Sequence, residues 1–109
     1  MKLTEKIMNA LGEESKERYK SKTEQEVFIF GARRALEEYA KGLWHEADEQ
    51  PAINSEVIIF AKKVLPSGQR VAPTYAAVYR DVMGRDVCLF TDIDIKADIL
   101  RWINVEDLP

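Results

Sequence analysis

The chain has 109 residues, of which 46% are hydrophobic and 32% charged, and its formal net charge is -3. This composition is typical of a globular protein with one modest core, and the acidic balance argues against a nucleic-acid module driven by bulk electrostatics. The single cysteine, Cys88, excludes an intrachain disulfide and a cysteine-rich zinc cluster. No apolar run approaches the roughly 20 residues that a membrane span requires, and the N-terminus lacks a secretory signal. We therefore expect a cytoplasmic protein that makes no membrane contact.

The first 22 residues are expected to form a short helix followed by a charged linker. Apolar side chains recur at helical spacing over residues 3–11. Thr4 is the expected N-cap of this helix, and Gly12 is the expected left-handed residue at its end. Residues 13–22 are mostly charged, which favours a solvated linker or helix surface over a partner-binding arm.

The clearest helix is predicted over residues 24–42. Thr23 and Glu26 have the spacing of a capping box, and Gly42 suits the position after the last turn. Gly31 in the middle of the helix costs about 1 kcal/mol relative to alanine. The wide apolar stripe indicates that the helix contacts two surfaces, either the sheet and the first helix or the sheet and a second protomer. The stripe consists of Phe28, Ala32, Ala35, Leu36, Tyr39 and Leu43, widened by Val27, Ile29 and Phe30.

At Trp44 the hydrophobic pattern changes from helical to alternating, which indicates strands. Asp92–Lys96 fits no element clearly. Short connections predict an antiparallel meander. The fold class is therefore predicted as α+β, with one or two N-terminal helices packed on an antiparallel sheet of about four strands, and a small curled β-barrel with an N-terminal helix is the alternative. Strands are expected at Glu56–Val64, Thr74–Arg80, Asp86–Thr91 and Ile99–Asn104, with turns at Leu65–Gln69 and Asp81–Arg85.

Residues with reactive side chains are few, and none of them forms a known catalytic pattern. His45 is the only histidine, and a local hydrogen bond is a simpler role for it than general base or metal ligand. Cys88 is expected to be a small buried hydrophobe. Asp92, Asp94 and Asp98 could hold a hard cation such as Ca²⁺, but the calcium-loop pattern is missing, so a solvated loop is expected. We predict no catalytic residue, no metal site and no cofactor.

Aromatic side chains give the main candidates for binding. Both tryptophans and two strand tyrosines can form an interaction surface or fill the core of a small domain. Interleaved with basic groups, they could also stack on single-stranded nucleic acid, although the net acidity makes nucleic acid the less favoured partner. The candidate binding residues are Trp44, His45, Tyr75, Tyr79 and Trp102; the basic groups are Arg33, Arg34, Lys62, Lys63, Arg70, Arg80 and Arg101.

A set of spaced motifs resembles a known family. The motifs are Phe28-x-x-Gly31-Ala32-x-x-Ala35-Leu36, Trp44-His45-x-Ala47-x-Glu49-x-Pro51, the strand Glu56–Ile59, and Trp102 with a terminal Asp107-Leu108-Pro109. Over about residues 24–109 the chain resembles short uncharacterised proteins of Bacteroides-type bacteria and their phages or prophages, and a phage-associated domain of unknown function with a Trp…Pro opening and a Val-x-x-Trp closing. The chain departs from this pattern at Arg34, where an aromatic residue is expected, and at Val105-Glu106. The resemblance implies a mobile-element origin and a small helix-plus-sheet fold, and it transfers no catalytic residue.

These observations favour a non-enzymatic protein-interaction module of a phage or mobile genetic element. Its partner is expected to be another protein or a second copy of the chain. The alternatives are an accessory nucleic-acid-binding protein and a small metal-dependent hydrolase. Residues 1–22 are predicted to be a short helix with a charged linker, and residues 23–109 a helix-plus-sheet domain.

Overall fold

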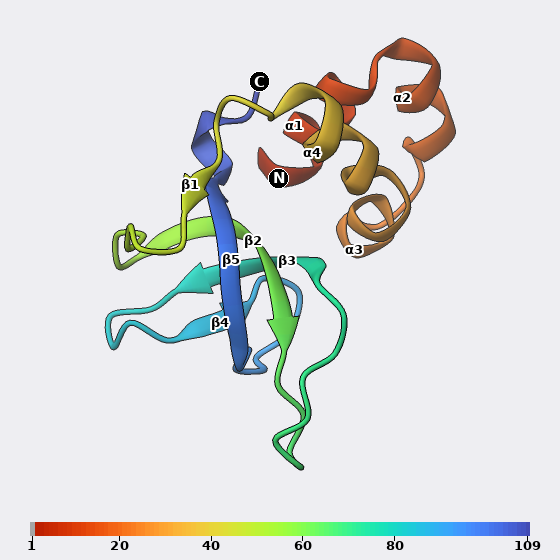
Figure 1. Cartoon of the computed structure of the whole chain (residues 1–109). Helices are drawn as coiled ribbons and strands as arrows, with labels where there is room; N and C mark the ends of the chain where they lie inside the picture. Colours follow the sequence, from red (N-terminus) through yellow and green to blue (C-terminus); the bar gives the residue numbers. More distant parts are fainter. Residues whose placement is uncertain (1) are drawn as a thin grey trace. The chain divides into compact units, whose positions relative to one another are not determined.

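The chain folds into two compact units, which together confirm the predicted α+β class (Figure 1). The structure is a computed structural model that describes residues 2–109, without the side chains of Lys2 and Tyr39. The sequence-based expectation for the Tyr39 side chain therefore lies outside the described residues. The helical unit extends to Leu43 and includes Val105–Pro109, and the sheet unit is Trp44–Asn104. The domain boundary expected after residue 22 stays a prediction.

The helical unit begins with α1 (Lys2–Leu11) and α2 (Glu13–Tyr19). Gly12 between them has a φ of 87°, as its predicted left-handed role requires. The prediction of Thr4 as N-cap is wrong, because α1 already begins at Lys2 and Thr4 lies inside its first turn. No residue of α2 is buried, so the charged segment is helical with a solvated surface.

The predicted long helix consists of α3 (Glu24–Val27), η1 (Phe28–Ala32) and α4 (Arg33–Tyr39) in direct succession. Thr23 caps it as predicted, because its side-chain oxygen accepts from the Glu26 amide at 3.3 Å. The helix ends at Tyr39, earlier than predicted. The chain then turns, and the Leu43 amide donates to the carbonyl of Ala40, three residues back, at 3.0 Å.

The central segment η1 is a π-helix, which no sequence motif indicated. A regular α-helix turns 100° per residue, so positions four apart drift by about 40° around its axis. A wider π-turn offsets this drift and keeps positions four apart on one face. The residues that gain from this are buried in pairs that repeat every four positions: Val27 and Phe28, Gly31 and Ala32, and Ala35 and Leu36.

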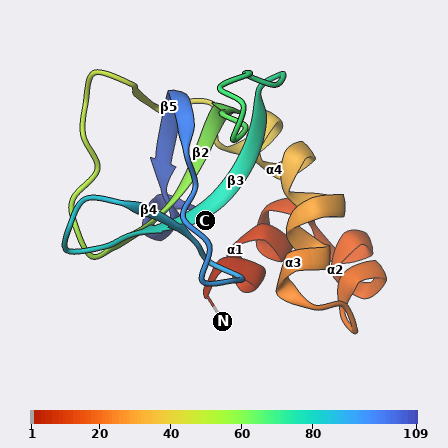
Figure 2. The ribbon, with the colours of Figure 1, turned by 90° about the horizontal axis from the view of Figure 1, so that it is seen from below.

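The sheet unit has β1 (His45–Glu46), β2 (Ser55–Lys63), β3 (Thr74–Arg80), β4 (Asp86–Cys88) and β5 (Ala97–Asn104). All pairs are antiparallel and the order is β1-β5-β2-β3-β4 (Figure 1). Figure 2 shows β2 between β5 and β3. The predicted simple meander is wrong, because β5 returns to pair with β2 in the order of a Greek key. The sheet is open, so the barrel alternative is also wrong.

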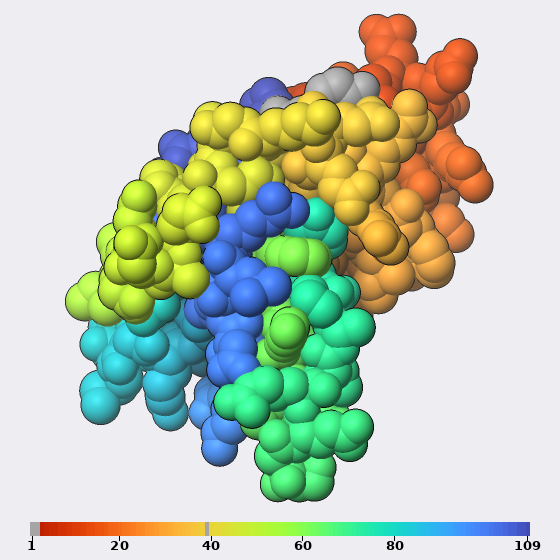
Figure 3. All heavy atoms as spheres, in the orientation of Figure 1, coloured from red at the N-terminus to blue at the C-terminus, as the bar shows by residue number. Residues whose placement is uncertain are grey.

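One predicted strand is shorter in the structure than expected. The strand expected over Asp86–Thr91 ends at Cys88, because the chain turns there and the Cys88 amide donates to the Ile93 carbonyl at 2.9 Å. The expected turns are present, with positive φ at Gly68 and Gly84. The loop after β2 extends away from the strands (Figure 3). The core of one sheet face consists of Val57, Ile59, Ala61, Val78 and Trp102.

The last turn, η2 (Val105–Asp107), belongs to the helical unit. The Lys6 ammonium on α1 donates to the carbonyls of Glu106 and Leu108, both at 2.7 Å. Val105 and Leu108 are buried. The two ends of the chain are therefore joined within one unit.

Candidate functional site

Three residues on neighbouring strands form a row across one face of the sheet. Phe60 on β2 lies opposite Tyr75 on β3 and opposite Arg101 on β5. Residues paired in this way point to the same face of an antiparallel sheet. The Phe60 and Tyr75 ring centroids are 4.9 Å apart, and the Arg101 Cζ lies 4.9 Å from the Phe60 centroid.

Trp44 completes this group, which we name the aromatic–arginine cluster: Trp44, Phe60, Tyr75 and Arg101. The Trp44 ring centroid lies 4.7 Å from the Arg101 Cζ and 5.9 Å from the Tyr75 centroid. The Arg101 Nη2 donates to the Tyr75 hydroxyl at 3.4 Å. All four side chains are half-buried. Cation–π contacts to two rings therefore fix the guanidinium in place.

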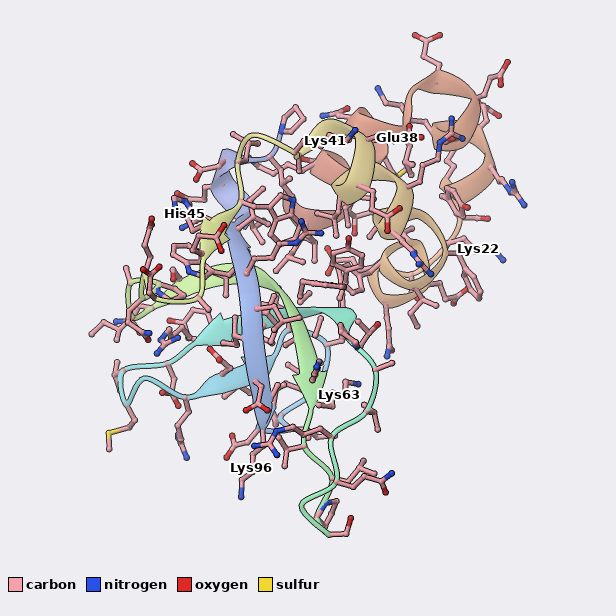
Figure 4. The ribbon with its side chains drawn as sticks, in the orientation of Figure 1. Lys22, Glu38, Lys41, His45, Lys63 and Lys96 are labelled. Atoms are coloured by element: carbon pink, nitrogen blue, oxygen red, sulfur yellow. The ribbon has the colours of Figure 1, made fainter. Side chains whose placement is uncertain are left out.

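A second group contains two of the other three predicted binding residues, His45 and Trp102. His45 on β1 pairs with Trp102 on β5, and their rings stack with centroids 4.3 Å apart. The His45 Nδ1 lies 2.9 Å from the Glu49 carboxylate, and the Trp102 indole N–H donates to the Glu49 carbonyl at 2.9 Å. Trp102 is only 7% exposed. Figure 4 labels His45 on β1. The arrangement ties the loop after β1 to β5, in keeping with the local hydrogen bond expected for His45.

Tyr79, the fifth predicted residue, lies apart from both groups. Its hydroxyl donates to the Asn54 side chain at 2.9 Å. The adjacent Arg80 donates to the Gln50 side chain at 3.0 Å and lies 3.7 Å from the Asp86 carboxylate. These bonds fasten the β1–β2 loop to the end of β3. The predicted binding residues are thus divided among three places rather than gathered in one surface.

Two aspartates near the β3–β4 turn have shifted pKa values of opposite sign. Burial raises the pKa of Asp86, and the positive charge of Arg80 offsets this only in part. The pKa of Asp81 is lowered, first because the Arg85 amide donates to its carboxylate at 2.9 Å, and further because the Arg85 side chain and the Met83 amide also donate. Asp81 thus stabilises the turn in its charged form.

The helical unit has its own candidate surface, formed by Ile29 and Phe30 of η1. Ile29 is 58% exposed and Phe30 is 67% exposed. The exposed positions that follow on the same helix are charged and neutralise one another in i,i+4 pairs. These pairs are Arg33 with Glu37 at 3.2 Å and Arg34 with Glu38 at 3.5 Å. The helix therefore exposes two adjacent apolar side chains, Ile29 and Phe30, which we name the Ile29–Phe30 patch. The surface beside this patch carries charges that are paired.

The remaining candidates form no site in the structure. Cys88 is half-buried and unbonded to another sulfur. Asp98 pairs with Arg70, and Asp94 lies 3.9 Å from Arg85. Within residues 2–109, no group of three or more histidine, cysteine or acidic side chains could hold a metal ion. None of the helices in that range is long and apolar enough to cross a bilayer.

Comparison with protein-family models, with curated proteins and with solved structures gives no match to this chain. The interpretation of both surfaces therefore depends on their physical chemistry.

One member of the aromatic–arginine cluster, Phe60, was not singled out from the sequence. Phe60 and Arg101 are far apart in the chain, and they become neighbours only through the pairing of β2 with β5. The cluster can be identified only from the register between paired strands. The alternation of residues within one strand carries no information about that register.

Proposed function

We propose that this protein is a non-enzymatic protein-interaction module that binds another protein through the Ile29–Phe30 patch. The observation that carries the proposal is the exposure of two adjacent large apolar side chains on an otherwise charged helix surface. Contiguous exposed apolar groups are typical of protein contacts, whereas single ones are common everywhere.

The structure around the patch supports a specific surface rather than a frayed one. The Tyr19 hydroxyl donates to the Phe30 carbonyl at 3.2 Å, so the backbone of η1 is held from α2. π-helical turns occur frequently at functional sites. The Arg33–Glu37 and Arg34–Glu38 pairs place polar groups beside the two apolar side chains, and apolar groups bordered by polar ones are common in interfaces.

A photo-crosslinking amino acid at position 30 tests this proposal in the source cells. We expect it to capture one defined protein or a second copy of the chain, identified by mass spectrometry. The matched control has the same group at position 53, because Ile53 is an equally large, exposed side chain on the sheet unit. Equal capture of many proteins from both positions, or capture from neither, would contradict the proposal.

The mobile-element origin of the protein and the two alternative functions are also proposals, and each has its own test. The resemblance to phage and prophage proteins supports a role in a mobile genetic element, and neighbouring phage genes in the genome would test that role. A salt-dependent gel shift with single-stranded DNA or RNA tests the nucleic-acid alternative, and a rise in melting temperature with divalent cations tests the metal-dependent hydrolase.

A further inference from the structure

Arg101 differs from the other arginines of the sheet unit. Arg70 pairs with Asp98, Arg80 with Asp86, and Arg85 with Asp81. Arg101 forms no ion pair with any carboxylate in the part of the chain that the structure describes. Its cross-strand neighbour on β1 is Glu46, yet the two charges do not meet.

One hydrogen-bond donor of Arg101, the Nε, is also unsatisfied. Its Nε is buried and has no partner, and its bond to the Tyr75 hydroxyl is long at 3.4 Å. Buried donors are almost always satisfied in native proteins, and each exception needs an explanation, such as stored strain, a role in chemistry, or a bound water or ion. The guanidinium is thus pre-positioned for an acceptor that the chain itself does not supply.

The surrounding rings indicate the shape of this acceptor. Trp44 and Phe60 both lie over the guanidinium, at 4.7 and 4.9 Å from its Cζ. Because the Nε is buried, an acceptor would meet the outer guanidinium nitrogens beside these rings. A carboxylate is flat and accepts two parallel bonds from an arginine. Phosphate can accept in the same way, but inorganic phosphate has no apolar part to contact the Trp44 and Phe60 rings, whereas the organic part of a carboxylic acid can pack against them.

We propose that the aromatic–arginine cluster is a recognition site for a carboxylate, presented by a small organic acid or by a peptide. The Arg101 side chain makes the charged contact, and the rings of Trp44 and Phe60 orient it. This site lies within the sheet unit and does not depend on the Ile29–Phe30 patch, so each proposal can fail alone.

The test follows the Nε–Hε signals of the arginines by NMR in the ¹⁵N-labelled wild-type protein. The probes are sodium acetate, sodium benzoate and a short peptide with a free C-terminus, compared with inorganic phosphate and sodium chloride at equal ionic strength. We expect a saturable shift of the Arg101 signal with the carboxylates only. Saturation at a lower concentration of peptide than of acetate would identify a peptide as the ligand. Saturation at a lower concentration of acetate would identify a small organic acid.

Two variants separate recognition from general charge effects. The Trp44 indole signal reports on the site in both, and circular dichroism checks that each is folded. Arg101→Lys is expected to weaken the response roughly tenfold, because lysine lacks the planar fork. Arg70→Lys is the matched control and is expected to keep it, since Arg70 is already paired. A saturable response to phosphate at lower concentration than to carboxylate, or a linear response to every salt, would overturn the proposal.

Discussion

At the scale of single residues, two residues that are adjacent in the sequence belong to different groups of side chains. Arg101 and Trp102 are adjacent on β5, as are Trp44 and His45 at the start of the sheet unit. Arg101 joins Trp44 in the aromatic–arginine cluster, whereas Trp102 stacks on His45. Because successive side chains of a strand point to opposite faces, two short dipeptides build two separate groups.

The two aspartates of the β3–β4 region lead to a prediction on pH. The pKa of Asp81 is lowered from its usual 3.8, so its contribution to stability is present above pH 3.8 and is lost as the pH falls through the lower folded-state pKa. The pKa of Asp86 is raised from 3.8, so its contribution is present below pH 3.8 and is lost as the pH rises through the higher folded-state pKa.

Urea unfolding of single variants between pH 2.5 and about 7 can separate these contributions. In the wild-type protein, Asp81 makes the free energy of unfolding rise with pH below 3.8, and Asp81→Asn is expected to remove this rise. Asp86 makes the free energy of unfolding fall with pH above 3.8, and Asp86→Asn is expected to remove this fall. Slopes of the same sign for both aspartates would contradict this assignment.

At the scale of secondary structure, the helix from Glu24 to Tyr39 shows how a four-residue repeat is accommodated. Gly31 in the π-turn η1 lies against two side chains of the same unit. A Cβ added there would lie 2.9 Å from the Leu11 Cδ1 and 3.5 Å from the Tyr19 ring. Gly31 thus permits a close approach of α1 and α2 side chains, which offsets its low helix propensity.

Gly31→Val is therefore expected to lower the free energy of unfolding by about 2 kcal/mol, because it overpacks this contact. Urea unfolding followed by circular dichroism measures the change. Gly42→Ala is the control, since no heavy atom lies within 4 Å of its added Cβ, and it is expected to change the free energy of unfolding by less than about 0.5 kcal/mol. Equal effects of the two variants would show that Gly31 has no packing role.

At the scale of the whole molecule, the chain returns to its first unit after the sheet is complete. Residues 105–109 belong to the helical unit, and the Lys6 ammonium holds their carbonyls. Short helices are marginally stable alone, so the helical unit depends on a segment that follows the sheet in the sequence.

Leu108→Ala tests this dependence, because Leu108 is buried although it is next to the end of the chain. We expect it to lower the free energy of unfolding by about 2 kcal/mol. The helical signal in circular dichroism, followed during urea unfolding, measures this loss. Pro109→Ala is the control because Pro109 is exposed, and equal unfolding midpoints for the two variants would show that the terminal segment is not part of the core.

Features that depend on neighbours along the chain could be predicted from the sequence alone. The cap at Thr23, the change of pattern at Trp44, the strands β2 and β3 and the turns at Gly68 and Gly84 follow from spacing and backbone preference. Thr4 was misassigned as a cap because a helix start signal of this kind does not fix the first residue.

Only the tertiary structure decided the strand order, the π-turn and the composition of the candidate sites. β5 pairs with β2, which is far away in the sequence, and not with β4, which precedes it. The alternation of residues within β5 would be the same in either pairing, so it cannot predict the partner strand. That choice places Phe60 beside Arg101. The physical reason is that a sheet joins residues through hydrogen bonds between strands, so its chemistry depends on register and not on distance along the chain.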